Sequence, residues 1–259
     1  MIVKEEVVIT PFKLPRTLHI YLPKHYDESD ERYSVLYMYD GHNLFHDEDA
    51  TYGKSWKMEE YLDFIEASII VVGIECNHEG NERLNEFCPF DVDHLHFGRI
   101  TGKGKVFMDW VVEELKPYID KTYRTLTDRE HTGIGGSSMG GLMALYSVAR
   151  YNEYFSKAAS LSPAVSFCFQ EIINMIKQYK IAPDTKVYID WGSDESRNKQ
   201  ALTYACSRNL EIAHLFSEQG ASIYPRIIIN GKHNESTWEQ QVPIFIDYLF
   251  KNIEKDREQ

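Results

Sequence analysis

The sequence predicts an α/β fold in which a mostly parallel central sheet carries helices on both faces. Short apolar runs rich in β-branched and aromatic residues alternate along the chain with longer segments of helical periodicity. This alternation favours parallel strands that are joined by right-handed crossovers. The chain has 259 residues, of which 43% are hydrophobic, and no repeat, low-complexity tract or linker interrupts it. We therefore predict a single domain over residues 1–259.

Each element follows from its local pattern. The buried strands are predicted at 33–39, 68–75, 130–136, 157–162, 185–191 and 224–230. Helices are predicted at 55–66, 105–121, 139–150, 166–179, 197–219 and 236–252. The first thirty residues contain two further extended runs, "VVITPF" and "RTLHIYLP", which predict an antiparallel hairpin or meander on one edge of the sheet.

Residues 76–104 fit neither periodicity. They contain a single proline but many glycine, asparagine and histidine residues. A long aperiodic segment is unusual in a compact domain and is often functional. It also follows the end of a predicted parallel strand, where open α/β sheets bind their ligands. We predict that this segment is a lid or substrate loop.

Composition excludes several classes of protein. The net charge of −12 provides no electrostatic basis for binding nucleic acid. The N-terminal "MIVKEEVVITPFKLP" is interrupted by two glutamates and resembles neither a signal peptide nor an anchor, and no run approaches the roughly 18 apolar residues of a membrane helix. The scattered cysteines predict reduced thiols in a cytoplasmic protein, with a zinc site as the weaker alternative. They are Cys76, Cys88, Cys168 and Cys206. The sequence indicates no oligomeric state.

The stretch "GIGGSSMGGLMAL" contains the pattern G-x-S-x-G in only one register, which centres it on Ser138. This serine lies where a predicted strand turns sharply into a predicted helix, as in a nucleophile elbow. Gly136 and Gly140 leave room for that turn. The Met139 N–H, at the start of the helix, is then free to donate to an oxyanion. The alternative is a glycine-rich turn with serines facing solvent.

A serine nucleophile needs a base and an orienting acid, which follow in that fold in the order serine, acid, histidine. Asp194 and Glu195 come just after the strand at 185–191, and His233 lies in the loop after the next strand. His214 falls within a helical pattern instead. His233 is therefore the predicted base, and a solvated turn histidine is the alternative. The two acids are also typical of a helix N-terminal cap.

Motifs spread over nearly the whole chain carry a family resemblance. They are "YLPKHYDESDERYSVLYMYDGHNLF", "ERLNEFCPF", "FMDWVVEELKPYIDKTYRT", "GGSSMGGLMAL", "VYIDWGSDE" and "GKHNESTW". On these motifs the chain resembles the putative esterase family of α/β-hydrolases, which includes enterochelin-esterase-like and feruloyl-esterase-like proteins. The resemblance implies an α/β-hydrolase fold and a serine esterase without a cofactor.

The same resemblance implies roles for individual residues. The family spacing after the late strand makes Glu195 the first choice for the triad acid and Asp194 the second, and the "H-N-E-x-x-W" match makes His233 the base. The loop after the first parallel strand is expected to supply the second oxyanion donor, with candidates Gly41 and His42.

"ERLNEF" matches a family motif near the site. Arg83 and Glu86 are therefore candidates for substrate binding, and the alternative is an ion pair that holds the loop. No metal is predicted. The cluster in "DVDHLH" lacks a helical H-E-x-x-H frame, so a polar loop is favoured over a metal site there. Its members are Asp91, Asp93, His94 and His96.

The functional prediction is a serine-dependent carboxylic ester hydrolase that acts on a small-molecule ester through an acyl-enzyme. An acyltransferase or thioesterase would use the same residues with a different acceptor or acyl donor. A non-catalytic binding protein built on the α/β-hydrolase fold is the other alternative. The complete set of serine, histidine and acid argues against it.

Overall fold

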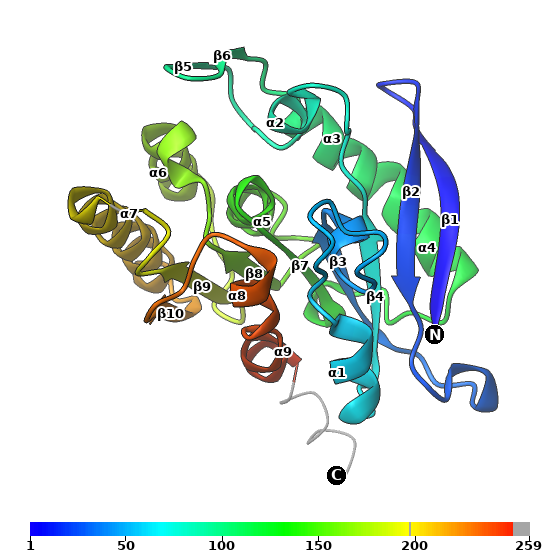
Figure 1. Ribbon diagram of the computed structural model, residues 1–259. Coiled ribbons are helices and arrows are strands. Elements are labelled where there is room, and N and C mark those ends of the chain that lie inside the picture. The colour runs from blue at the N-terminus through cyan, green and yellow to red at the C-terminus, as the bar shows by residue number, and fades with distance from the viewer. Residues whose placement is uncertain (197, 251–259) are drawn as a thin grey trace.

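The computed structural model describes residues 1–196 and 198–250. An eight-stranded sheet runs through the molecule in the order β1-β2-β4-β3-β7-β8-β9-β10 (Figure 1). Neighbours from β4 to β10 are parallel, whereas β1 and β2 pair antiparallel with each other and β2 pairs antiparallel with β4. The strands are β1 (Ile2–Ile9), β2 (Leu14–Tyr21), β3 (Ser34–Tyr39), β4 (Ile69–Ile74), β7 (Thr132–Ser137), β8 (Lys157–Leu161), β9 (Lys186–Gly192) and β10 (Ser222–Ile228).

Helices cover both faces of this sheet (Figure 1). Buried side chains of α3, α4, α5, α6 and α7 pack on one face, and those of α1, α8 and α9 pack on the other. The helices are α1 (Met58–Phe64), α2 (Glu82–Glu86), α3 (Gly104–Trp110), α4 (Lys116–Thr122), α5 (Met139–Arg150), α6 (Phe169–Gln178), α7 (Lys199–Glu218), α8 (Glu235–Glu239) and α9 (Val242–Phe250). This is the mostly parallel α/β architecture that the alternating periods predict.

The predicted elements match these bounds within a few residues, with three differences. The helix predicted at 105–121 is divided into α3 and α4 by a π-helical turn at Val111–Leu115, and the one predicted at 236–252 is divided into α8 and α9. The predicted positions 197, 251 and 252 lie outside the described residues. The segment 76–104 contains α2 and a hairpin of β5 (Val92–His94) with β6 (Gly98–Ile100), so it is not aperiodic throughout.

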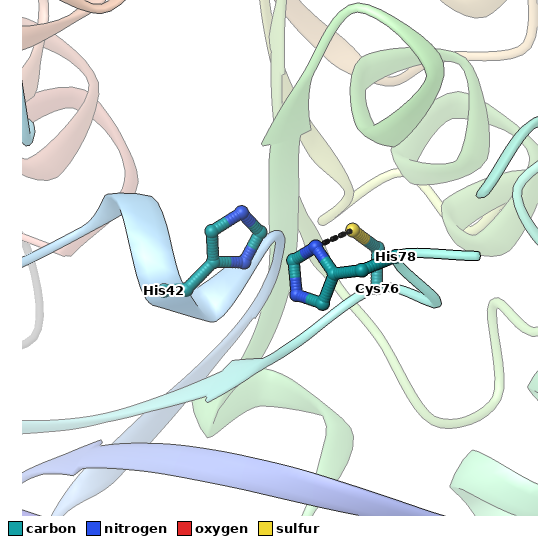
Figure 2. A group of neighbouring side chains, drawn as sticks. All are labelled: His42, Cys76 and His78. Carbon is teal, nitrogen blue, oxygen red and sulfur yellow. Dashed lines mark hydrogen bonds between the residues drawn. The ribbon is translucent and has the colours of Figure 1, made fainter. Parts of the chain in front are cut away.

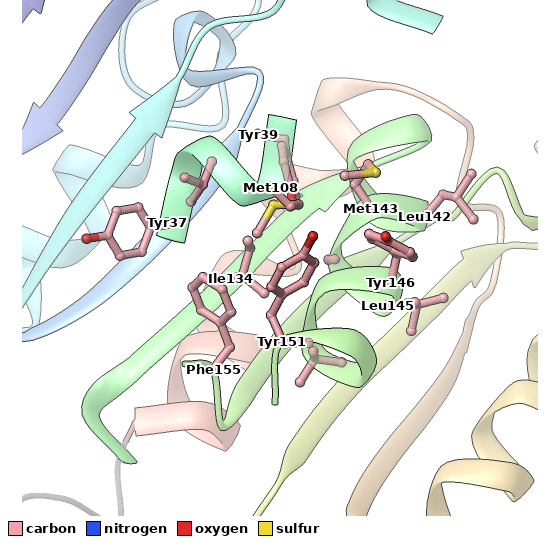
Figure 3. Packing of buried hydrophobic residues seen from close by; sticks show 14 of the residues in the cluster. Tyr37, Tyr39, Met108, Ile134, Leu142, Met143, Leu145, Tyr146, Tyr151 and Phe155 are labelled. Carbon is pink, nitrogen blue, oxygen red and sulfur yellow. The ribbon is translucent and has the colours of Figure 1, made fainter. Parts of the chain in front are cut away.

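Helix α5 lies at the centre of the larger core cluster, and Figure 3 shows its side chains packed against aromatic residues of β3. The Tyr39 hydroxyl lies 2.9 Å from Ser147 Oγ and thereby links β3 to α5. At Gly141, a Cβ atom would lie only 2.8 Å from the Leu161 carbonyl oxygen, so glycine allows α5 to approach β8. This close packing fixes the start of α5, where Ser138 lies.

Candidate active site

Ser138 lies between β7 and α5 with φ 57° and ψ −118°, a strained conformation for a residue with a side chain. Its N–H donates to the Leu161 carbonyl at 2.9 Å, and its carbonyl accepts from the Ala164 N–H at 2.9 Å. The surrounding backbone therefore holds the turn. Met139 is the first residue of α5, and N–H groups in the first helical turn lack intrahelical acceptors. Ser137, in contrast, is the last residue of β7 and is 5% exposed.

Glu195 follows β9 and contacts His233 in the loop between β10 and α8. Glu195 Oε2 lies 3.0 Å from His233 Nδ1, and Glu195 Oε1 accepts from the Gly192 N–H at 2.5 Å. Burial alone raises the pKa of this carboxyl group, but hydrogen bonds from His233, Gly192 and Ser162 outweigh it and lower the pKa below its usual value. Glu195 is therefore ionised where it meets the imidazole.

Asp194, the second candidate acid, points elsewhere. Its carboxylate lies 3.7 Å from the Lys199 ammonium group and is 44% exposed. Its backbone N–H donates to the Gly231 carbonyl at 2.9 Å. Of the two neighbouring acids, the structure thus brings Glu195 to His233 and pairs Asp194 with a lysine at the surface.

Three residues that the sequence analysis did not single out support this pair. Ser162, with φ 45°, accepts a 2.9 Å hydrogen bond from the Trp238 indole N–H. The Trp238 ring also packs edge-on against the His233 ring, with 5.1 Å between centroids. Beneath them, buried Asp190 accepts from the Ser162 N–H at 3.1 Å, and burial raises its pKa to about 7. Trp238 lies in the quoted "GKHNESTW" motif, whereas no local pattern marks Ser162 or Asp190.

The loop after β3 forms a tight turn at Gly41–Asn43. A Cβ atom at Gly41 would overlap the backbone of Gly73 in β4, so only glycine allows the turn to lie this close. The buried His42 ring forms a hydrogen bond of 2.8 Å between its Nε2 atom and Thr51 Oγ1. Burial lowers the pKa of His42 to about 4 although the nearby Asp40 charge opposes this shift. Both Gly41 and His42 remain candidate oxyanion donors through their backbone N–H groups.

Arg83 and Glu86, on α2, both form ion pairs. Arg83 binds Asp40 through two hydrogen bonds of 2.7 Å, and it also lines a cavity with Ser138. Glu86 is 2% exposed, and both of its oxygens accept from Arg16 at 2.8 Å. The structure therefore favours the loop-holding interpretation for Glu86, whereas Arg83 both holds Asp40 and faces the cavity.

Two cavities meet at Ser138 and His233, because both residues line each of them. One, of about 500 Å³, is lined mainly by polar side chains: Asp40, His42, Asn43, Thr51, Asn77, His78, Arg83 and Glu235. The other, of about 590 Å³, is more apolar, with Ala164, Val165, Phe167, Trp191, Leu202 and Tyr204. The segment 76–104 contributes Arg83, Cys76, Asn77, His78 and Gly80 to the polar cavity.

The acidic and histidine residues of "DVDHLH" do not converge on one point. Asp91 and Asp93 pair with Arg99 at 2.8 and 3.1 Å across the β5–β6 hairpin. The His94 ring instead stacks on Phe167, with 4.4 Å between centroids. These contacts suit the polar loop that the sequence analysis favoured.

The fold and site can be compared with known proteins. The model of the family described as Putative esterase matches residues 10–246. The chain belongs to this family. A relative of this chain is the uncharacterized protein YbbA of Bacillus subtilis (strain 168), which is 24% identical over 190 residues, covering 72% of each chain.

Solved structures share its fold. The IroE-like serine hydrolase from Shewanella oneidensis superposes with a TM-score of 0.79 at 20% identity, over 97% of this chain and 80% of that one. The BES protein from Bacillus cereus superposes with a TM-score of 0.76 at 18% identity, over 96% of this chain and 94% of that one. The enterobactin esterase FES from Shigella flexneri superposes with a TM-score of 0.75 at 16% identity, over 98% of this chain and 59% of that one. The chain therefore has the α/β-hydrolase fold, and its family supports ester hydrolysis as its activity.

Every helix within residues 1–196 and 198–250 is too short or too polar to span a lipid bilayer. Cytoplasmic location stays a prediction from the cysteine pattern.

Proposed function

We propose that this protein is a serine-dependent carboxylic ester hydrolase with Ser138 as nucleophile, His233 as base and Glu195 as orienting acid. The observation that carries the proposal is the 3.0 Å contact between Glu195 Oε2 and His233 Nδ1. It lies beside the two cavities that Ser138 and His233 share. A carboxylate at Nδ1 fixes the tautomer in which Nε2 can accept the serine proton.

The reaction begins when His233 Nε2 takes the hydroxyl proton of Ser138 and the serine oxygen attacks the ester carbonyl carbon. The oxyanion that forms accepts hydrogen bonds from the Met139 N–H and from an N–H of Gly41 or His42. As the tetrahedral intermediate collapses, His233 returns the proton to the departing alcohol and leaves an acyl-enzyme. Water then attacks the acyl group, again with His233 as base, and the acid is released. No cofactor takes part in these steps.

The substrate is a small-molecule ester that extends from Ser138 into both cavities. The polar cavity suits an oxygen-rich portion, because Asn77 and Arg83 line it. The other suits an apolar or aromatic portion, because Phe167 and Trp191 line it. Solved structures with this fold include a ferulic acid esterase and an enterobactin esterase, and these similarities support a small ester substrate.

Matched serine variants test the nucleophile. A panel of short-chain, aryl and sugar acetate esters, together with thioesters, identifies a substrate that wild type hydrolyses. On that substrate, Ser138→Ala should lose kcat by a factor on the order of 10⁶, because the proposed nucleophilic hydroxyl is removed. Ser137→Ala should keep most activity. Equal losses in the two variants contradict the assignment, as does a wild type that hydrolyses no ester in the panel.

A further inference from the structure

A second group of reactive side chains lies in the polar cavity, apart from the proposed triad. His42 follows β3, and Cys76 and His78 follow the adjacent strand β4. One ligand atom from each of the three lies within 4.8 Å of the others. Figure 2 shows the two imidazole rings next to each other in an edge-to-face arrangement, with the Cys76 sulfur beside His78. The ring centroids are 4.7 Å apart, and Cys76 Sγ lies 3.9 Å from His78 Nδ1.

His42 has one ring nitrogen hydrogen-bonded outside the cluster, and one ring nitrogen of His78 faces a carboxylate outside it. His42 Nε2 meets Thr51 Oγ1 at 2.8 Å, and His78 Nε2 lies 3.7 Å from the Glu75 carboxylate. A hydroxyl or carboxylate on the far nitrogen is the arrangement that orients imidazoles toward a metal. It leaves Nδ1 of each ring for the cluster.

The remaining nitrogen of His42 is a buried polar atom without a hydrogen-bond partner among the described residues. The residue is 4% exposed and lines the polar cavity. Buried polar atoms in native structures are nearly always paired, and an unpaired one calls for a functional explanation. A metal ion bound to His42 Nδ1 would satisfy it.

We propose that His42, Cys76 and His78 bind a divalent transition metal ion of the zinc class, with a fourth coordination position facing the cavity at Ser138. Two imidazole nitrogens and one thiolate suit Zn²⁺, and three protein ligands with one open position are typical of zinc sites exposed to a cavity. Ligand atoms in such a site lie roughly 3.5 Å apart given zinc's bond lengths. The ligand atoms here lie within 4.8 Å of one another, so some must move closer to bind the ion. His78 can move in this way because its side chain is 55% exposed.

Metal binding requires the Cys76 thiol to lose its proton. Each M²⁺ that binds forms one metal–sulfur bond and releases one H⁺ to solvent.

Metal titration of the full chain tests the site directly, whatever the outcome of the ester assays. Metal-free protein is titrated with Zn²⁺ in competition with a chromogenic chelator, and with Co²⁺ while the near-ultraviolet spectrum is recorded. We expect one metal ion per chain and, with Co²⁺, a thiolate-to-metal charge-transfer band. Cys76→Ser should abolish that band, and His78→Ala should weaken Zn²⁺ binding at least 100-fold.

Two residues of α7 provide matched controls. Cys206→Ser and His214→Ala remove a thiol and an imidazole outside the cluster and should leave stoichiometry, affinity and spectrum unchanged. Thermal unfolding verifies that each variant is folded. The exposed position of His78 keeps its variant informative even if Cys76→Ser does not fold. The proposal is overturned if wild type binds no stoichiometric metal, if binding survives His78→Ala unchanged, or if a control variant loses it.

Discussion

Replacing Glu195 by glutamine changes one atom at the centre of the proposed triad. In the wild type, Oε1 accepts from the Gly192 N–H at 2.5 Å and Oε2 meets His233 Nδ1 at 3.0 Å. The Gly192 N–H can only donate, so the glutamine carbonyl oxygen should take the Oε1 position. The amide NH₂ then faces His233 and donates to Nδ1. The imidazole proton then lies on Nε2, so Nε2 cannot accept the proton of Ser138.

The size of the effect follows from that tautomer. An amide in place of the orienting carboxylate leaves the geometry intact but lowers kcat by a factor of about 10⁴ in the serine–histidine–acid mechanism. At 1.36 kcal/mol for each tenfold change in rate, this is about 5.4 kcal/mol of transition-state stabilisation. We expect Glu195→Gln to lose activity on this scale, with a much smaller effect on KM than on kcat, because the proposed role of Glu195 is exerted through His233.

Steady-state kinetics on the best ester of the panel measure the loss, and circular dichroism verifies the fold. Asp194→Asn is the matched control, because Asp194 pairs with Lys199 near the surface rather than with His233. Exposed ion pairs contribute little, so this variant should stay within a few-fold of wild type. A larger loss in Asp194→Asn than in Glu195→Gln would refute the reasoning. Near-normal activity in both would mean that no carboxylate orients His233.

Two further predictions concern the residues around the triad. Arg83→Ala should leave Asp40 as an uncompensated buried carboxylate and cost about 3–5 kcal/mol of unfolding free energy. A lower Tm would reveal this loss. A raised KM at unchanged Tm would instead mean that Arg83 serves only the substrate. Asp190 has a folded-state pKa of about 7 and a usual value of 3.8, so the folded state retains a proton that the unfolded chain loses. Its contribution to stability therefore falls as pH rises between these values, and urea unfolding of Asp190→Asn should show a weaker decline over that range. An identical pH dependence in the variant would show that Asp190 titrates normally.

Local sequence patterns were sufficient to predict most of the fold. Periods of 2 and 3.6 residues reflect which face of each strand or helix is buried, and they survive without tertiary information. The π-helical turn at Val111–Leu115 lies within continuous helical periodicity, so periodicity alone did not reveal it. The β5–β6 hairpin is too short to show a period, and its Arg99 pairs with Asp91 and Asp93 across the turn.

The candidate site likewise contains residues that the sequence pattern indicated and residues that it did not. The elbow at Ser138 and the loop at His233 follow strands of recognisable pattern, so the G-x-S-x-G register, chain order and the family motif pointed to them. Ser162 and Asp190 meet this site only because β8 and β9 are neighbours in the sheet. Likewise, His42 approaches Cys76 only because β3 pairs with β4. Contacts of this kind depend on strand order, which composition and spacing do not encode.

The central claim, that Ser138 is an activated nucleophile, is tested most directly by covalent labelling. A fluorophosphonate probe reacts with a serine hydroxyl only where a base and an oxyanion site activate it. After labelling of the native enzyme and proteolysis, tandem mass spectrometry of the peptide around "GGSSMGG" locates the modified residue. The account predicts stoichiometric modification of Ser138 and its loss in His233→Ala. Modification of Ser137 instead, or no modification of the native enzyme, would contradict it.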